Sequence, residues 1–142
     1  MMRVLISYTE DMDVTIISYD GLFAICRLAP GDELPVWSTE SDFLSVTRNP
    51  DEVSIVCSQH LIPQDVHCSR DWRMMRIKGV LDLRMTGVLS GLLLALSAED
   101  VSVFVLSTFD TDYFMVPEQM LKQAFEILKE EGHCLVEGHL AL

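Results

Sequence analysis

The order of apolar patterns in the C-terminal half limits the fold more than any other feature of the chain. Large residues alternate in part over 72–78, which predicts a strand, and the segment 85–98 is helical in composition. Two short apolar runs, 101–106 and 113–116, flank a polar turn and predict a hairpin. A second helix and a last strand at 133–136 follow. This strand–helix–strand–strand–helix–strand order predicts an α+β fold of the ferredoxin-like type.

The second of these helices has the clearest periodic signal. Its apolar residues recur with the spacing of one helical face, at Leu121, Ala124, Phe125 and Leu128. Pro117 fits the first position of the helix, where its missing N–H is not needed. Gly132 fits the position just beyond the last turn. We therefore expect a helix that packs this apolar stripe against the sheet.

The turn of the predicted hairpin is richer in polar side chains than a turn requires. The segment 107–115 reads STFDTDYFM, whereas a tight hairpin turn usually contains a glycine beside Asn or Asp. This tip lacks glycine and instead gathers hydroxyls and carboxylates, at Ser107, Thr108, Asp110, Thr111 and Asp112. Such a composition suits the binding of a small polar ligand.

The two carboxylates of the tip leave several interpretations open. Asp110 and Asp112 are two residues apart and share a face if the strand extends that far. Such a pair can act as acid and base, bind a metal ion or hold a cationic amine. Either carboxylate can equally cap the turn through a side-chain hydrogen bond. No nucleophile–base set accompanies them, so the sequence favours a non-catalytic protein.

The start of the first helix is the second candidate for a ligand contact. Helix N-termini leave backbone N–H groups free and favour an anion, and Gly87 lets a carboxylate approach the backbone closely. Thr86 can cap the helix or offer its hydroxyl to a ligand. Asp82 is either a solvated loop residue or faces a ligand's ammonium group. Close packing against the sheet or another helix equally explains the stripe of small residues Gly87, Gly91, Ala95 and Ala98.

The N-terminal half repeats the pattern of the C-terminal half in a weaker form. Residues 47–56 align with 107–116 at a shift of 60 without a gap, and both segments read strand, polar turn, strand. Residues 23–28 resemble 72–77 at a shift of 49. We interpret this similarity as a degenerate tandem repeat.

The repeat suggests how the chain divides into domains. At 142 residues the chain is long enough for one domain or for two small ones that share a core. We expect an N-terminal domain over 1–62, a linker over 63–70 and a C-terminal domain over 71–142. Prolines and a glycine within 29–41 allow only a short helix in the first unit.

Composition and charge restrict the partners and the compartment. A hydrophobic content of 49% provides for a sizeable core, and the net charge of −12 argues against nucleic acid or an anionic membrane as partner. The longest apolar segment is too short to span a bilayer, and the N-terminus lacks the pattern of a signal peptide. We therefore expect a cytoplasmic protein.

Motifs for catalysis, cofactors and metals are missing from the sequence. The four cysteines are scattered without a CxxC pair, and the four histidines show no metal-ligand spacing. No GxSxG, GxGxxG or phosphate-binding loop occurs. The sequence therefore predicts reduced structural thiols and a protein that is not an enzyme and holds no cofactor or metal.

Two stretches of the chain resemble a known family. Small stand-alone proteins with two ACT domains are similar in their C-terminal domain to IKGVLDLRMTGVLSGLLLALSAEDVSVFVLSTFDTDYFMVPEQMLKQAFEILKEEGH. Their N-terminal ACT-like half resembles FAICRLAPGDELPVWSTESDFLSVTRNPDEVSIVC. The most specific blocks are TGVLSGLL and STFDTDYFMVP. The animal cytosolic arginine sensors upstream of the TOR kinase are similar, but they contain two such two-domain units in tandem.

The resemblance implies a regulatory role and a site. ACT domains are regulatory modules that bind amino acids, usually at interfaces between ACT units. Their ligand contacts fall, in this sequence, on the first helix and on the hairpin: Asp82, Thr86, Gly87, Val88 and Leu89, and Ser107, Thr108, Phe109, Asp110, Thr111 and Asp112. Backbone amides at 87–89 would receive the α-carboxylate, and Asp112 or Asp82 the α-ammonium group.

We accordingly expect an amino-acid-binding sensor that pairs as a homodimer through its ACT units and acts on a metabolic enzyme or regulator. The ligand belongs in the second unit, because Arg48, Asn49 and Pro50 replace the hydroxyl–acid pattern in the first. The alternative is a protein-interaction module with a vestigial pocket.

Overall fold

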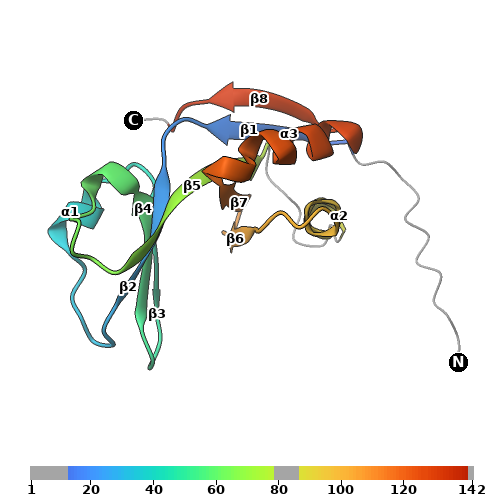
Figure 1. Cartoon of the computed structure of the whole chain (residues 1–142). Coiled ribbons are helices and arrows are strands. Elements are labelled where there is room, and N and C mark those ends of the chain that lie inside the picture. Colours follow the sequence, from blue (N-terminus) through green and yellow to red (C-terminus); the bar gives the residue numbers. More distant parts are fainter. Residues whose placement is uncertain (1–12, 79–86, 141–142) are drawn as a thin grey trace, which may run out of the picture.

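The computed structural model describes residues 13–78 and 87–140, which form one open sheet of eight strands with helices packed on it (Figure 1). The first elements are β1 (Thr15–Tyr19), β2 (Phe23–Leu28), α1 (Val36–Thr39), β3 (Ser45–Arg48), β4 (Val53–Ser58) and the 3-10 helix η1 (Gln59–Leu61). There follow β5 (Cys68–Ile77), α2 (Val88–Ala98), β6 (Phe104–Ser107), β7 (Asp112–Pro117), the 3-10 helix η2 (Glu118–Met120), α3 (Leu121–Glu130) and β8 (Cys134–Gly138). The predicted α+β class and the ferredoxin-like order of the second unit are confirmed.

The long strand β5 belongs to both repeat units. Its first part pairs with β2, where Cys68 lies opposite Cys26, and its last part pairs with β7, where Met75 lies opposite Phe114. In the first unit, β5 is the last of four strands in the order β3–β4–β2–β5. In the second unit, the same strand is the first element of the βαββαβ pattern. The repeat units therefore share a strand.

β1 lies between two strands that a ferredoxin-like unit would place side by side. It pairs antiparallel with β5 and parallel with β8, with Ile16 opposite Ile77 on one side and Leu135 on the other. The second unit thus has the order β6–β7–β5–β1–β8. Its sheet contains one strand from the N-terminal part of the chain.

The predicted domain boundary falls among these shared elements. β5 begins at Cys68, inside the predicted linker 63–70. β1 comes from the predicted N-terminal domain, 1–62, yet pairs within the sheet of the second unit. The division into two domains stays a prediction.

The pairing registers correct the alignment of the two units by one residue. In the two hairpins, the last pair before the turn is Arg48 with Val53 and Ser107 with Asp112. The hairpins therefore correspond at a shift of 59, and the predicted shift of 60 is wrong. A slip of one residue would move every side chain to the other face of the sheet. An ungapped alignment of the two segments does not take the strand register into account.

Pro117 occupies a different position from the predicted one. It is the last residue of β7, with φ −57° and ψ 140°, and the helix α3 begins at Leu121 after the turn of η2. The predicted first helical position at Pro117 is wrong. The apolar stripe is confirmed, because Ala124 and Leu128 are fully buried.

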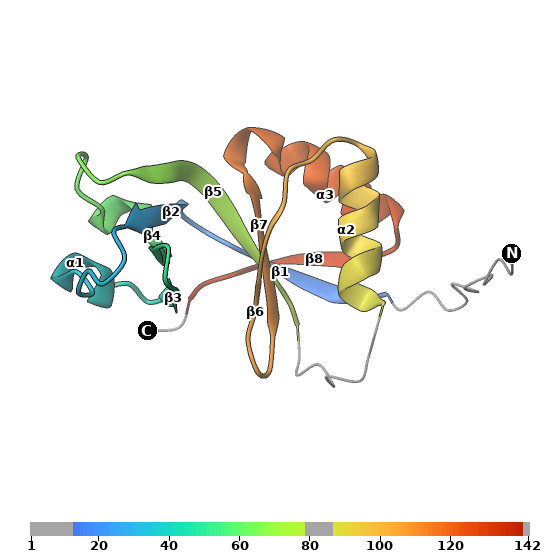
Figure 2. The same ribbon diagram turned by 90° about the horizontal axis from the view of Figure 1, so that it is seen from below.

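The sheet has a core on each face. On one face of the second unit, α2 and α3 lie over the sheet (Figure 2). There Leu96 and Leu128 pack in one cluster with Met75 and Phe114. The opposite face carries a cluster that joins the two units: Tyr19, Phe23, Val56, Met74 and Met115. A third cluster lies in the first unit and includes Trp37 of α1. The continuous cluster between the units makes them parts of one packed body.

Candidate functional site

The tip of the β6–β7 hairpin is closed by its own polar side chains. Ser107 Oγ donates a hydrogen bond of 2.6 Å to Asp112 Oδ1, across the last strand pair. Thr108 N donates to Thr111 O at 2.8 Å, and Thr111 N donates to Thr108 Oγ1 at 3.1 Å. The two threonine hydroxyls lie 2.6 Å apart. Hydrogen bonds between Thr108 and Thr111 therefore close the turn at the predicted hydroxyl-rich tip.

Phe109 and Asp110 form the exposed end of this turn. Among the described residues, positive φ outside glycine occurs only at Asp71 and Asp100, so the tip is not a turn of the primed type. Phe109 is 81% exposed. Asp110 lies outside β7, so Asp110 and Asp112 do not share a strand face.

Asp112 lies on the face of the sheet that α2 covers. Side chains alternate along a strand, and Phe114, two residues further along β7, packs in the same cluster as Leu92 and Leu96 of α2. Ser107, opposite Asp112 in the pair, lies on this face too. The carboxylate thus lies on the helix side of the sheet.

The N-terminus of α2 offers backbone donors. Gly87 precedes the helix with φ 103°, a conformation that favours glycine, and no side chain forms a cap hydrogen bond there. Gly91 N donates to Gly87 O at 2.9 Å, so the amides of the first turn ahead of Gly91 have no partner within the helix. Val88 and Leu89 pack their side chains against the core cluster of α2 and α3.

The two predicted segments lie at the same end of the second unit. Figure 2 shows the β6–β7 turn and the N-terminal end of α2 pointing toward the same side of the molecule. Of the predicted site residues, Asp82 and Thr86 lie outside the described residues. The other nine occupy these two segments: Gly87, Val88, Leu89, Ser107, Thr108, Phe109, Asp110, Thr111 and Asp112.

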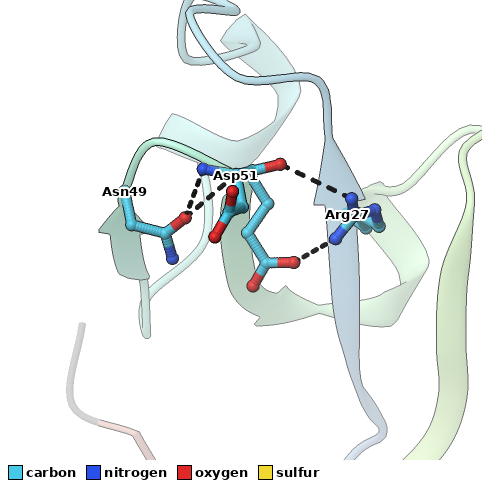
Figure 3. Close-up of polar contacts among 4 residues, drawn as sticks. Arg27, Asn49 and Asp51 are labelled. Atoms are coloured by element: carbon cyan, nitrogen blue, oxygen red, sulfur yellow. Dashed lines mark hydrogen bonds and ion pairs between the residues drawn. The ribbon is translucent and has the colours of Figure 1, made fainter.

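The corresponding hairpin of the first unit is built differently (Figure 3). Asn49 Oδ1 accepts hydrogen bonds from Asp51 N at 2.8 Å and from Glu52 N at 3.0 Å. The Arg27 guanidinium pairs with Glu52 and donates to Asp51 O at 3.5 Å. This turn is closed by an Asx motif and a cation from β2, so its polar groups serve the turn itself.

The structure adds a cavity of about 470 Å³ that the sequence did not predict. It lies on the sheet face opposite α2 and α3, and its lining includes Tyr19, Arg76 and Tyr113. Burial raises the pKa of Tyr19, and the nearby Arg76 charge lowers it in part. The alternation over 72–78 places Arg76 on the face of Met74, but no local pattern shows that four other strand and loop segments line the same cavity.

Three of the four cysteines lie close together in the first unit. Cys26 and Cys57 are buried, Cys68 is half-buried, and all are free thiols. A hydrogen bond with Cys57 and burial raise the pKa of Cys26.

Across residues 13–78 and 87–140, no group of three His, Cys, Asp or Glu side chains could hold a metal ion. The described helices include none that is both long and apolar enough to cross a membrane.

Fold and site together describe a small α+β protein of two fused ferredoxin-like units. A family model of the ACT domain matches residues 67–130, and a second model, of an N-terminal domain, matches residues 21–65. The chain belongs to the ACT domain family. No protein with a curated description matches the sequence.

Solved structures share this architecture. A protein from Agrobacterium tumefaciens is 32% identical with a TM-score of 0.84, over 89% of this chain and 95% of that chain. A protein of unknown function from Vibrio cholerae is 16% identical with a TM-score of 0.69, over 84% and 90% of the two chains. The regulatory subunit of aspartate kinase from Thermus flavus is 10% identical with a TM-score of 0.59, over 84% and 98%. The last two likenesses concern the fold alone.

Proposed function

We propose that this protein is a non-catalytic regulatory module that binds a free amino acid at the end of its second unit. The observation that carries the proposal is the position of Asp112 on the sheet face covered by α2, at the end where α2 begins. A carboxylate and a row of backbone donors that have no partner within the helix are the two groups that a zwitterion requires.

The two halves of the ligand would meet different parts of the site. The backbone amides that follow Gly87 would receive the α-carboxylate, since a helix N-terminus favours an anion. Asp112 accepts one hydrogen bond from Ser107 and has acceptor capacity left for an α-ammonium group. Asp82 and Thr86 remain part of the proposal. The other hairpin residues would form the outer wall of the site.

We further propose that the protein pairs as a homodimer near this site. α2 contains no charged residue, and it exposes Gly91 and 64% of Leu94. A helix that is apolar on all sides is usually covered. β6 is an edge strand that pairs only with β7 among the described strands, which leaves its outer side available. A second copy seated here would complete the site between two ACT units.

The regulated partner would be a metabolic enzyme or a regulator in the cytoplasm. The family supports a regulatory role, and the Thermus flavus protein with a similar fold is the regulatory subunit of aspartate kinase. The two-domain division at 63–70 is retained within this proposal.

Thermal unfolding in the presence of each of the twenty amino acids tests the proposal. A ligand at about one hundred times its Kd raises the free energy of unfolding by about 2.7 kcal/mol, which shifts Tm by several degrees. Asp112→Ala should abolish the shift, because the ammonium group loses its counter-charge. Asp51→Ala, in the corresponding turn of the first unit, is the matched control and should respond like the wild type.

Absence of any shift at millimolar concentration, or a shift that persists in Asp112→Ala, would contradict the proposed site. The alternative is a protein-interaction module, which the self-paired threonine turn and the exposed Phe109 favour. In that case a metabolic enzyme or transcription factor would co-purify with the protein regardless of amino acids, and Phe109→Ser would release it.

A further inference from the structure

The cavity on the helix-free face of the sheet is separate from the hairpin site. Its lining includes Tyr113, and Tyr113 and Asp112 are neighbours in β7, so their side chains lie on opposite faces of the sheet. The volume of about 470 Å³ lies in the range of small-molecule pockets. A ligand bound there would not contact Asp112 or the start of α2.

Both repeat units contribute apolar walls to this cavity. Ile17 of β1 and Val136 of β8 come from the sheet of the second unit, and Phe43 comes from the segment before β3. Leu140, after β8, completes the apolar lining. Phe43 and Tyr113 pack edge to face with ring centroids 5.0 Å apart, which fixes the wall between the two units. The shape of the cavity therefore depends on the packing of one unit on the other.

The polar part of the cavity is centred on Arg76. In the sheet, Arg76 lies opposite Ile17 on one side and opposite Tyr113 on the other. Its Nε is buried and has no hydrogen-bond partner among the described residues. A buried donor without a partner is costly, by more when it carries charge. The Arg76 side chain itself lines the cavity, so its guanidinium offers N–H donors to a bound acceptor.

Hydroxyls and a second cation accompany this guanidinium. Tyr19 lies close enough for the Arg76 charge to lower the pKa of its phenol against the effect of burial. Lys78, two residues beyond Arg76, also lines the cavity. Asp42 and Glu137 line it as well and are both exposed. Lys78 is exposed like the two acids, so Arg76, which is half-buried, is the least exposed charge of the lining.

We propose that this cavity binds a small organic carboxylate with an apolar body. The planar guanidinium of Arg76 matches a carboxylate through two parallel N–H···O bonds. The phenols of Tyr19 and Tyr113 would donate further hydrogen bonds, and the apolar walls would enclose the body of the ligand. An inorganic anion such as phosphate would leave those walls in contact with water, and a neutral amide would not use the charge of Arg76.

Titrations followed by NMR of the full-length protein test this inference. The probes are isobutyrate and 3-phenylpropionate, with isobutyramide and inorganic phosphate as chemical controls. The carboxylates should shift the amide signals of Val136 and Tyr113 and the Nε–H signal of Arg76, and the two controls should not. Arg76→Gln should weaken carboxylate binding at least about tenfold, as expected for the loss of a charged hydrogen bond.

Two control variants separate this site from other effects. Arg73→Gln removes a cation from the same strand. Arg73 also has a buried Nε, but its Nη2 donates a hydrogen bond to Tyr19 O. Arg73 is not part of the cavity lining. Asp112→Ala disables the proposed amino-acid site. Both should bind the carboxylates as the wild type does, so failure of either proposal is recognised independently of the other.

Val136→Trp is the second variant that tests the inference, for the case in which Arg76→Gln does not fold. Val136 is 39% exposed, so a larger side chain there fills the cavity from its rim and should abolish carboxylate binding. The inference is overturned if no probe binds at millimolar concentration or if the amide binds as well as the acid. It is equally overturned if binding survives both Arg76→Gln and Val136→Trp.

Discussion

Cys26 shows how one buried side chain is adjusted by its neighbours. It lies opposite Cys68 across β2 and β5, and it packs in the same buried cluster as Cys57. A hydrogen bond with Cys57 and burial raise the pKa of Cys26 above the value of an ordinary thiol. The contribution of Cys26 to stability is present below about pH 8.5, where unfolded thiols are protonated, and decreases as the pH rises above that value. The same contact with Cys26 lowers the pKa of Cys57, so Cys57 contributes in the opposite direction.

Thiol labelling at pH 8 should therefore distinguish the four cysteines. Cys134 is exposed and should react with Ellman's reagent at once, whereas Cys26 and Cys57 should react at least about one hundred times more slowly, because they require local unfolding. Cys134→Ser should remove the fast phase alone. Rapid labelling of Cys26 or Cys57 in that variant would contradict the buried thiol cluster.

The parallel pair of β1 and β8 is the element that a ferredoxin-like unit would not include. Gly138, the last residue of β8, lies opposite Tyr19. A Cβ atom at Gly138 would lie 2.4 Å from Ile17 Cγ2, a branched position close to the backbone. β1 and β8 therefore leave no room at position 138 for a side chain larger than that of glycine.

Gly138→Ala should lower the free energy of unfolding by about 1–3 kcal/mol, the usual cost of overpacking. Gly91→Ala, in the middle of α2, is the matched control, because a Cβ atom there meets nothing within 4 Å. It should raise the free energy of unfolding by up to about 1 kcal/mol through helix propensity. Urea denaturation measures both changes. Equal effects of the two substitutions would show that β8 does not pack on β1 as described.

At the scale of the whole molecule, the two units should unfold together. They share β5, and one cluster of buried residues spans both. Ile55→Ala in the first unit and Leu96→Ala in the second each empty a fully buried position, at a cost of about 2–5 kcal/mol. Each should move the same single transition in calorimetry and in far-UV circular dichroism. A second transition that only one substitution moves would contradict a shared core.

Local patterns made most elements of this molecule predictable. The stripe through Ala124 and Leu128 and the apolar runs beside the 107–112 turn depend on nearby residues, and these elements are confirmed. The insertion of β1 between β5 and β8 and the double use of β5 depend on pairing between distant residues, which periodicity does not encode. The place of Arg76 in the cavity depends on the same pairing between distant segments.

The candidate site was predictable to the extent that its chemistry is local. The hydroxyls and carboxylates of the hairpin tip can be read from the sequence, but the Ser107–Asp112 and Thr108–Thr111 pairings depend on the turn geometry. Gly91 illustrates the converse. Its place in a small-residue stripe suggested close packing, yet it is exposed and meets no neighbour within the described chain.

The sharing of β5 has a consequence for how such a chain can change over generations. A break in the gene within 68–77 would divide β5 and leave each unit with only part of that strand, so the two units are constrained to stay on one chain. The turn residues 49–52 and 108–111 form no strand pair with β5, so they can diverge without disturbing its pairing. The Asn49 turn and the Thr108 turn are closed by different hydrogen bonds, as this unequal freedom allows: one shared strand carries two tips with separate chemistries.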